Sequence, residues 1–204
     1  MIAHAHVDFQ PTPHNAKGVR APSPPSSPLP KSPLSPRPMT NTIRPATPAD
    51  LPLIAQLIRD LAEYEKLAHE VRFDEATLEA HLFGPRPMAE VVIGEIDGAP
   101  QGFALFFHNF STFEGRPGIY LEDLYVRPAA RGSGLGKALL LHLAHLAEQR
   151  GCARLEWSVL NWNAPSIGFY KSLGARPMDE WTVMRVDGAT LAQLAADARA
   201  LAAS

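Results

Sequence analysis

A glycine-rich turn, Arg-Gly-Ser-Gly-Leu-Gly at 131–136, constrains the fold more than any other feature of this chain. The segment before it, IYLEDLYV at 119–126, is rich in strand-forming residues. The segment after it, LGKALLLHLAHLAEQR, repeats apolar residues at helical spacing and ends at Gly151. A strand, a glycine turn and a helix in this order indicate an α/β chain.

The remaining elements follow from periodicity and from turn residues. Thr47, Pro48 and Asp50 predict a helix start with Thr47 as the N-cap, and the apolar spacing predicts a helix end at about Tyr64 or Glu65. Further helices are predicted at 74–83, from NWNAPS to Gly174, and at 189–203, and strands at 43–46, 89–96, 102–110, 153–160 and 181–186. This order predicts an α/β sandwich with a mixed sheet.

The composition changes near residue 40. Ten of the 20 prolines lie between Pro11 and Pro38, and residues 1–40 as a whole have a net charge of +3. Such a segment cannot bury enough apolar surface to offset its ordering entropy, so residues 1–40 are predicted to be a disordered or polyproline II extension, and 41–204 the folded domain. The extension is either a docking tail, with one PxxP spacing at Pro30–Pro33, or a dispensable addition upstream of Met39.

Charge and cysteine content exclude several classes of protein. The net charge is −2, and −5 without the extension, which argues against nucleic-acid binding. The single cysteine, Cys152, excludes a disulfide framework and a cysteine-based zinc site. The chain has neither an apolar run long enough to span a membrane nor a signal-peptide pattern, so we expect no membrane partner and a cytoplasmic location.

The glycine-rich turn is suited to a phosphate group, because it presents backbone N–H groups at the positive end of a helix. A Walker A loop is excluded, since Arg131 and Ala138 stand where it needs glycine and Ser or Thr. A dinucleotide fingerprint fits poorly, although Glu156 lies at its usual spacing. An acyl-CoA loop of the form R/Q-x-x-G-x-G/A fits, and a turn without any ligand remains an alternative.

Three segments in order, YLEDLYV, RGSGLG and NAPSIGFYKSLGA, resemble the GNAT acetyltransferase superfamily. IRPATPAD, LAEYEKL, GFALFF and WTVMRVDG extend the resemblance to the diamine branch, which includes spermidine/spermine and thialysine acetyltransferases. The resemblance runs from about Ile43 to about Ala195. It implies a mixed, mostly antiparallel sheet flanked by helices, an acyl-CoA loop between the central strand and a helix, acetyl-CoA as co-substrate, and a homodimer.

The resemblance also implies how acetyl-CoA is held. A bulged strand would direct backbone N–H groups at the thioester and pantetheine arm, and the glycine-rich loop would hold the pyrophosphate. The implied residues are Leu124, Tyr125 and Val126 in the strand, Arg131, Gly132, Ser133, Gly134, Leu135, Gly136 and Lys137 in the loop, and Asn163, Ser166 and Tyr170 after it.

The resemblance implies catalytic roles for two residues, Tyr170 and Glu122. Tyr170 would protonate the departing thiolate as a general acid; without the family it would be read as a core aromatic residue. Glu122 would accept the amine proton through a water, or anchor the substrate. A lysine-like amine costs about 4.6 kcal/mol to deprotonate at neutral pH, so some base or water path is needed.

The residues expected to contact the amine substrate include several carboxylates. Tyr64 and Glu65 match a family pair that contacts the distal part of a long amine, and Glu156 and Glu180 add negative charge, or are solvated surface carboxylates. Glu122 and Asp123 are adjacent on a strand and are expected to point to opposite faces, with only one of them near the acetyl group.

The sequence thus predicts an N-acetyltransferase that acts on a small cationic amine by direct transfer, because Cys152 lies away from the thioester motifs. The alternatives are acetylation of a protein N-terminus, a lysine or an amino acid, or a non-catalytic acyl-CoA sensor. No metal is expected, since His142 and His145 have ligand-like spacing but no third ligand.

Overall fold

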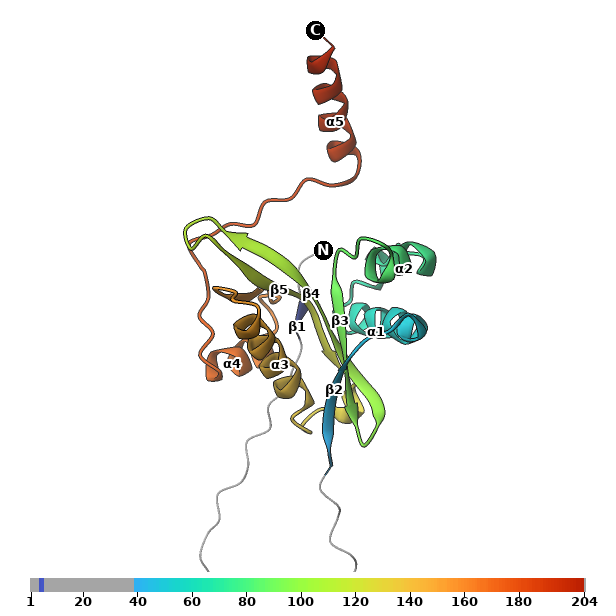
Figure 1. The fold of residues 1–204 in the computed structure, drawn as a ribbon, viewed down its shortest axis with the longest axis vertical. Helices are drawn as coiled ribbons and strands as arrows, with labels where there is room; N and C mark the ends of the chain where they lie inside the picture. Colours follow the sequence, from blue (N-terminus) through green and yellow to red (C-terminus); the bar gives the residue numbers. More distant parts are fainter. Residues whose placement is uncertain (1–3, 6–38, 204) are drawn as a thin grey trace, which may run out of the picture.

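The computed structural model describes residues 4–5 and 39–203. A mixed sheet runs through the centre, with helices α1 and α2 on one side and α3 and α4 on the other (Figure 1). The strands are β1 His4–Ala5, β2 Asn41–Pro45, β3 Glu90–Ile96, β4 Ala99–Ser111, β5 Arg116–Val126 and β6 Leu155–Trp157. The helices are α1 Leu51–Tyr64, α2 Glu75–Phe83, α3 Leu135–Gln149, α4 Ala164–Ser172 and α5 Gly188–Ala202, with short 3-10 turns at Pro48–Asp50, Ala68–Glu70 and Pro128–Ala130.

Strands β2 to β5 form an antiparallel meander in sequence order. On its other edge, β5 has two parallel partners, one after the other along its length. β6 pairs with Ile119–Leu121, and β1 pairs with Asp123 and Leu124. The predicted mixed, mostly antiparallel sheet is therefore confirmed, and β5 is its central strand.

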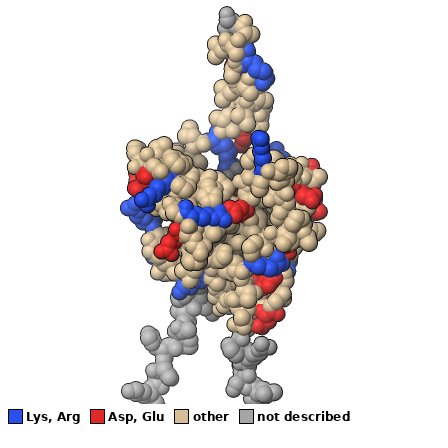
Figure 2. All heavy atoms as spheres, viewed as in Figure 1, with Lys and Arg blue, Asp and Glu red and all other residues tan. Residues whose placement is uncertain are grey.

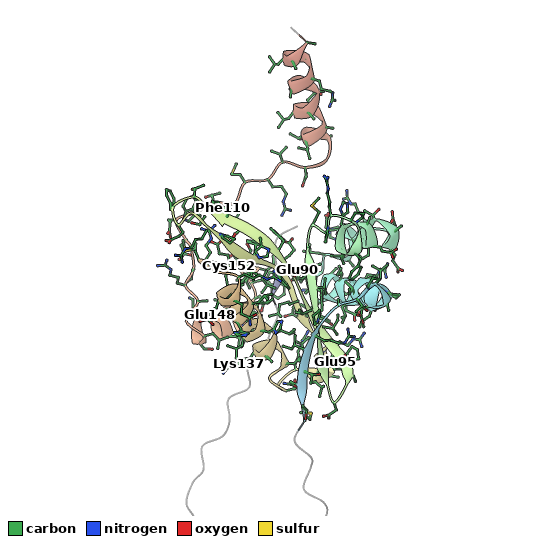
Figure 3. All side chains as sticks on the ribbon, in the orientation of Figure 1. Glu90, Glu95, Phe110, Lys137, Glu148 and Cys152 are labelled. Carbon is green, nitrogen blue, oxygen red and sulfur yellow. The ribbon has the colours of Figure 1, made fainter. Side chains whose placement is uncertain are left out.

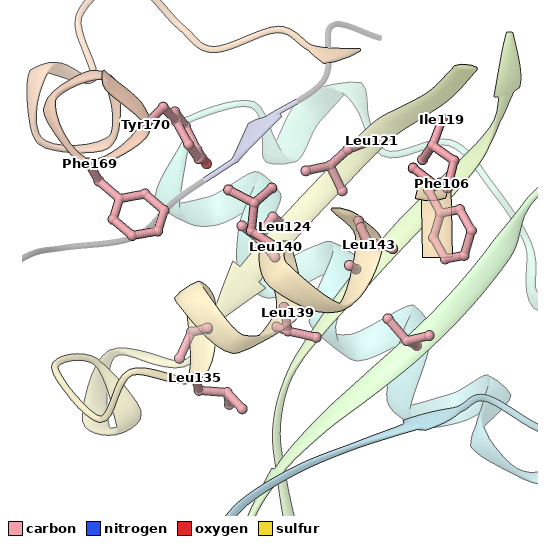
Figure 4. Close-up of a cluster of buried hydrophobic side chains, with 14 of the residues drawn as sticks. Phe106, Ile119, Leu121, Leu124, Leu135, Leu139, Leu140, Leu143, Phe169 and Tyr170 are labelled. Atoms are coloured by element: carbon pink, nitrogen blue, oxygen red, sulfur yellow. The ribbon is translucent and has the colours of Figure 1, made fainter. Parts of the chain in front are cut away.

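The core has two parts, one on each face of the sheet. Leu121, Leu124 and Tyr170 belong to the part between the sheet and α3 and α4 (Figure 4). Ile54, Phe103 and Tyr125 belong to the part under α1 and α2. β3 approaches α3 closely at Gly94, where an added Cβ would lie 3.0 Å from the Leu135 side chain and would force that side chain to shift.

The predicted start of the first helix is confirmed. Thr47 donates its backbone N–H to the Asp50 carboxylate at 2.8 Å, and the Arg44 guanidinium donates two hydrogen bonds of 2.8 Å to the same carboxylate. Asp50 thus joins the helix start to β2, which precedes it in the chain.

Three predictions about secondary structure were wrong in part. Residues 181–186 form no strand, because no strand in the described part of the chain supplies them with a ladder of hydrogen bonds. The strand predicted at 153–160 is shortened to β6, since it pairs with β5 over three residues only. The extension predicted to lack regular structure contains β1; residues 1–3 and 6–38, including the Pro30–Pro33 spacing, lie outside the described residues.

No helix in the described part of the chain is long and apolar enough to cross a membrane.

Candidate active site

A β-bulge lies at the centre of the candidate site. Leu105 of β4 pairs with Asp123, and the next residue, Phe106, pairs with Leu121, so Glu122 is the extra residue of β5. Leu121 and Leu124 consequently lie in the same part of the core, although regular alternation would place residues three apart on opposite faces. The bulge that the family resemblance implied is therefore present, and its extra residue is Glu122, the predicted general base.

The bulge changes the expectation for the two adjacent carboxylates. Their placement on opposite faces assumed regular strand alternation, which does not hold across the extra residue. Asp123 alternates with Leu124 and therefore lies on the face of the sheet that α1 covers.

Three carboxyl groups gather between β5 and the end of α1. Burial and then the charge of Asp123 raise the pKa of Glu65, which is 7% exposed, to about 8. Burial and then the charge of Glu122 raise the pKa of Asp123 to about 7. Burial also raises the pKa of Glu122. Such a group holds protons near neutral pH, and a nearby cation would stabilise its ionised forms.

The edge of β5 beyond Leu121 is where an extended ligand can bind. β6 ends its pairing at Leu121, so the following residues of β5 have no β6 partner, and the two residues of β1 pair with this stretch instead. The side chains of Leu124, Tyr125 and Val126 are buried, which leaves only their backbone groups for a ligand. The edge therefore accepts an extended chain.

The glycine-rich loop follows directly on this edge. Gly134 has φ +83°, in the left-handed region that glycine adopts without strain, and it is the N-cap of α3. The first helical hydrogen bond comes from the N–H of Ala138 to the carbonyl of Gly134, so the N–H groups of Gly136 and Lys137 precede the helical ladder. Lys137 stands exposed in this first turn (Figure 3). This geometry suits a phosphate group.

The remaining residues of the glycine-rich loop differ in which of their groups are accessible to a ligand. Gly132 is exposed with φ +77°, while Ser133 is half-buried and uses its hydroxyl to accept the N–H of Leu135 at 3.3 Å. The Leu135 side chain is buried in the core, so only its backbone can face a ligand.

The structure brings together two residues that the sequence assigned to different ligands. The guanidinium of Arg131, predicted to bind CoA, lies 4.8 Å from the ring centre of Tyr64, predicted to contact the amine. Tyr64 also approaches Trp162, with 6.0 Å between ring centroids. The end of α1 thus touches the phosphate loop, and Trp162 is a residue that sequence reasoning missed; its signal was its place in NWNAPS, just before the N-cap of α4.

Tyr170 is 3% exposed, and its ring packs edge-on against Trp157 with centroids 4.9 Å apart. Within the described residues its hydroxyl has no hydrogen-bond partner, although it is buried. Burial raises the pKa of the phenol, so the group keeps its proton at physiological pH. The aromatic ring therefore belongs to the core, while its hydroxyl is available to donate to a ligand.

Asn163 and Ser166 are both buried, and Asn163 caps α4 by accepting the N–H of Ser166 at 3.3 Å. Asn163 immediately precedes α4, and Tyr170 lies in the same helix, one turn after Ser166.

The two remaining predicted acids lie in different surroundings. Glu156 accepts a hydrogen bond from Asn109 at 2.6 Å and pairs with Arg154 at 2.8 Å, which neutralises much of its charge. Glu180 is exposed, between α4 and α5, and makes no hydrogen bond or ion pair within the described residues. Neither Glu156 nor Glu180 is part of the cluster of three carboxyls that Glu65, Glu122 and Asp123 form. In the described part of the chain, no three metal-ligating side chains gather into a site.

The site of this α/β protein combines a bulged central strand, an adjoining glycine loop at a helix start and a group of buried or half-buried carboxyls. The chain belongs to the acetyltransferase (GNAT) family, whose model matches residues 54–175. It is accordingly an N-acetyltransferase, and enzymes of this family use acetyl-CoA as co-substrate.

Curated relatives extend over nearly all of the folded part. The chain is 40% identical over 164 residues to thialysine N-epsilon-acetyltransferase of Bos taurus, covering 75% of this chain and 96% of the relative. It is 31% identical over 198 residues to L-ornithine N5-acetyltransferase of Arabidopsis thaliana, covering 75% and 87%. Among solved structures, an integron cassette protein from the mobile metagenome of V. cholerae has a TM-score of 0.64 at 28% identity, covering 76% of this chain and 97% of that one.

Proposed function

We propose that this protein transfers the acetyl group of acetyl-CoA directly to a primary amine of a small cationic substrate, such as thialysine, a polyamine or a related diamine. The observation that carries the proposal is the group of Glu65, Glu122 and Asp123 beside the stretch of the β5 edge that β6 leaves uncovered. The names of the relatives, thialysine and L-ornithine acetyltransferases, support an amine that carries further charges.

Acetyl-CoA would bind along β5 and the glycine loop. Its pantetheine arm takes the place of a neighbouring strand at the backbone of Leu124, Tyr125 and Val126, and its pyrophosphate lies at the first turn of α3. An N–H of the bulged strand that faces the thioester oxygen stabilises the negative charge that develops there.

The acidic group would bind the amine and take its proton. A positive ammonium lowers the raised pKa values of the three carboxyls and so favours their ionised forms. Glu122, the extra residue of the bulge, then accepts one proton, directly or through a water, as the amine nitrogen forms its bond to the acetyl carbon. Glu65 and Asp123 hold the remaining positive charge of the substrate.

Tyr170 would complete the reaction. When the bond from the acetyl carbon to sulfur breaks, the departing thiolate takes a proton from the Tyr170 hydroxyl, which has no protein acceptor in the described structure. Direct transfer within the complex of enzyme, acetyl-CoA and amine requires no acyl-enzyme intermediate. Cys152, just after α3, therefore takes no part in the reaction.

The test is release of CoA from acetyl-CoA by the purified full chain with thialysine, ornithine, spermidine, spermine, putrescine, lysine and short peptides as acceptors. Turnover on the small amines with more than one charge, and little on the peptides, supports the proposal. Preference for a peptide would indicate a protein acceptor, and acetyl-CoA binding without transfer to any amine would indicate a sensor. We also propose a cytoplasmic homodimer, as the family resemblance implies.

A further inference from the structure

Asn41, the first residue of β2, contacts the glycine-rich loop from a place 92 positions earlier in the sequence. Its side-chain amide donates a hydrogen bond from Nδ2 to the backbone carbonyl oxygen of Ser133 at 3.0 Å. Its other polar atom, Oδ1, is buried and has no hydrogen-bond partner within the described residues. The reverse orientation of the amide would place two acceptor oxygens together, so the donor faces the loop.

The hydrogen bond fixes the direction of the next N–H group in the loop. In a planar trans peptide, the C=O and the N–H point in opposite directions. The carbonyl of Ser133 points toward Asn41, so the N–H of Gly134, in the same peptide unit, points away from β2. Gly134 is exposed and is the N-cap of α3, so a ligand can reach this N–H together with those of the first helical turn.

Without the bond from Asn41, nothing in the local backbone preference would hold this peptide unit in one orientation. Gly134 has φ +83°, and glycine adopts positive and negative φ about equally readily. If the peptide unit between Ser133 and Gly134 turned over, its C=O would replace its N–H on the exposed side. A carbonyl oxygen repels a phosphate group, whereas an N–H binds it. The glycine that permits the turn therefore also needs a contact that fixes it.

The direction of the N–H groups matters because the positive side chains are dispersed. On the face of the molecule shown in Figure 2, lysines and arginines are interspersed with acidic residues and do not gather into one patch. Of the two cations in the loop, Arg131 has its guanidinium over the ring of Tyr64, and Lys137 is exposed. Binding of a phosphate group at this loop therefore depends on well-directed backbone donors.

We propose that Asn41 is a positioning residue for the pyrophosphate of acetyl-CoA. By holding the carbonyl of Ser133, it directs the N–H of Gly134 toward the ligand. The inference rests on the proposed function, which places the pyrophosphate at the first turn of α3. Asn41 acts through the loop and not on the reacting atoms, so its loss should weaken binding of the phosphate-bearing half of CoA and leave the pantetheine half unaffected.

Three variants separate the amide donor of Asn41 from the strand that carries it. Asn41→Leu removes the donor and keeps a side chain of similar length. Asn41→Asp keeps the shape and places a carboxylate oxygen, which cannot donate, against the carbonyl of Ser133. Thr42→Val is the matched control, because Thr42 is the next residue of β2, is exposed, and donates its hydroxyl to Glu95 at 3.3 Å rather than to the loop. Thermal unfolding verifies that all three fold.

The experiment measures binding of CoA to the full chain by titration calorimetry, and displacement of CoA by each of its halves. One half, 3′-phosphoadenosine 5′-diphosphate, has the two bridged phosphates, and the other, pantetheine, has none. For Asn41→Leu we expect the Kd of CoA and of the diphosphate half to rise about 10-fold, as for one lost hydrogen bond to a charged ligand, and to rise further for Asn41→Asp. The Kd of pantetheine should not change, and Thr42→Val should bind as the wild type does.

Two kinds of failure can be told apart. If the wild type binds CoA no more tightly than pantetheine, the loop does not hold the pyrophosphate, and the placement in the proposed function fails together with this inference. If the wild type prefers CoA and Asn41→Leu keeps the same preference, only the role of Asn41 is overturned. An equal loss of affinity for both halves would also overturn it, because that result indicates a general disturbance of the fold.

Discussion

Glu65, at the end of α1, and Asp123, in the bulged strand β5, lie close enough for the charge of Asp123 to raise the pKa of Glu65. They are 58 positions apart in the sequence, and each is buried or half-buried. Their proximity joins the first helix of the domain to the strand that we propose holds the thioester. The acidic site is therefore built by tertiary contact across the sheet face, and its protonation can be tested directly.

Replacing Glu65 with Gln should change how stability depends on pH. The folded-state pKa of Glu65 is raised from 4.5 to about 8, so its contribution to stability is fully present below 4.5 and is lost as the pH rises to about 8. The wild type should lose free energy of unfolding over this window, and Glu65→Gln should lose less, by about 1–3 kcal/mol. Urea unfolding at several pH values measures this. Parallel curves for the two proteins would contradict a raised pKa.

Replacing Glu122 with Gln should lower kcat by about 10²–10⁴-fold, as expected when a general base is removed. In the wild type, kcat/KM should rise with pH as the carboxyls, with raised pKa values, ionise. The variant should lose one of these ionisations. Glu156→Gln is the matched control and should retain most activity, because Glu156 is held by Arg154 and Asn109. An unchanged kcat and pH profile for Glu122→Gln would assign the base role to another group.

Two tyrosine-to-phenylalanine changes should have opposite effects. Tyr170→Phe removes a buried hydroxyl without a partner, so stability should stay the same or rise by up to about 1 kcal/mol, while kcat falls at least about 100-fold. Tyr120→Phe removes a hydroxyl that shares a 2.9 Å hydrogen bond with Ser158, so stability should fall by about 1 kcal/mol with activity retained. Thermal unfolding and steady-state kinetics on both variants measure this. Full activity of Tyr170→Phe would exclude it as the acid.

Freeing the β5 edge from β1 should strengthen acetyl-CoA binding. β1 pairs with Asp123 and Leu124, where we place the pantetheine arm, so strand and ligand compete for one edge. Changing both His4 and Ala5 to Pro weakens the strand by removing its backbone donors, and should lower the KM for acetyl-CoA several-fold. Deletion of residues 1–38 should act in the same way. Ala16→Pro, outside β1, is the control and should leave the KM unchanged. An identical KM in all four proteins would exclude competition at this edge.

Much of the fold could be predicted from local pattern. Thr47 and Asp50 stand at the first helix start, Gly134 stands at the start of α3, and Asn163 caps α4, each within a residue or two of the predicted boundary. These features depend on residues near each other in the chain, so sequence spacing is sufficient. Residues 181–186 were predicted as a strand from composition alone, but a strand also needs a neighbour, and residues 4–5 and 39–203 do not supply one.

By itself, the sequence determined the order of most elements, the glycine-rich turn at the start of α3 and the family to which its motifs belong, because each depends on short-range spacing. Only the tertiary structure decided that Glu122 is the extra residue of a bulge, that Asp123 lies near Glu65, and that Arg131 stacks on Tyr64. These relationships depend on the register between β4 and β5 and on the packing of α1 against the sheet. Both are set by contacts between residues far apart in the chain, which local pattern does not record.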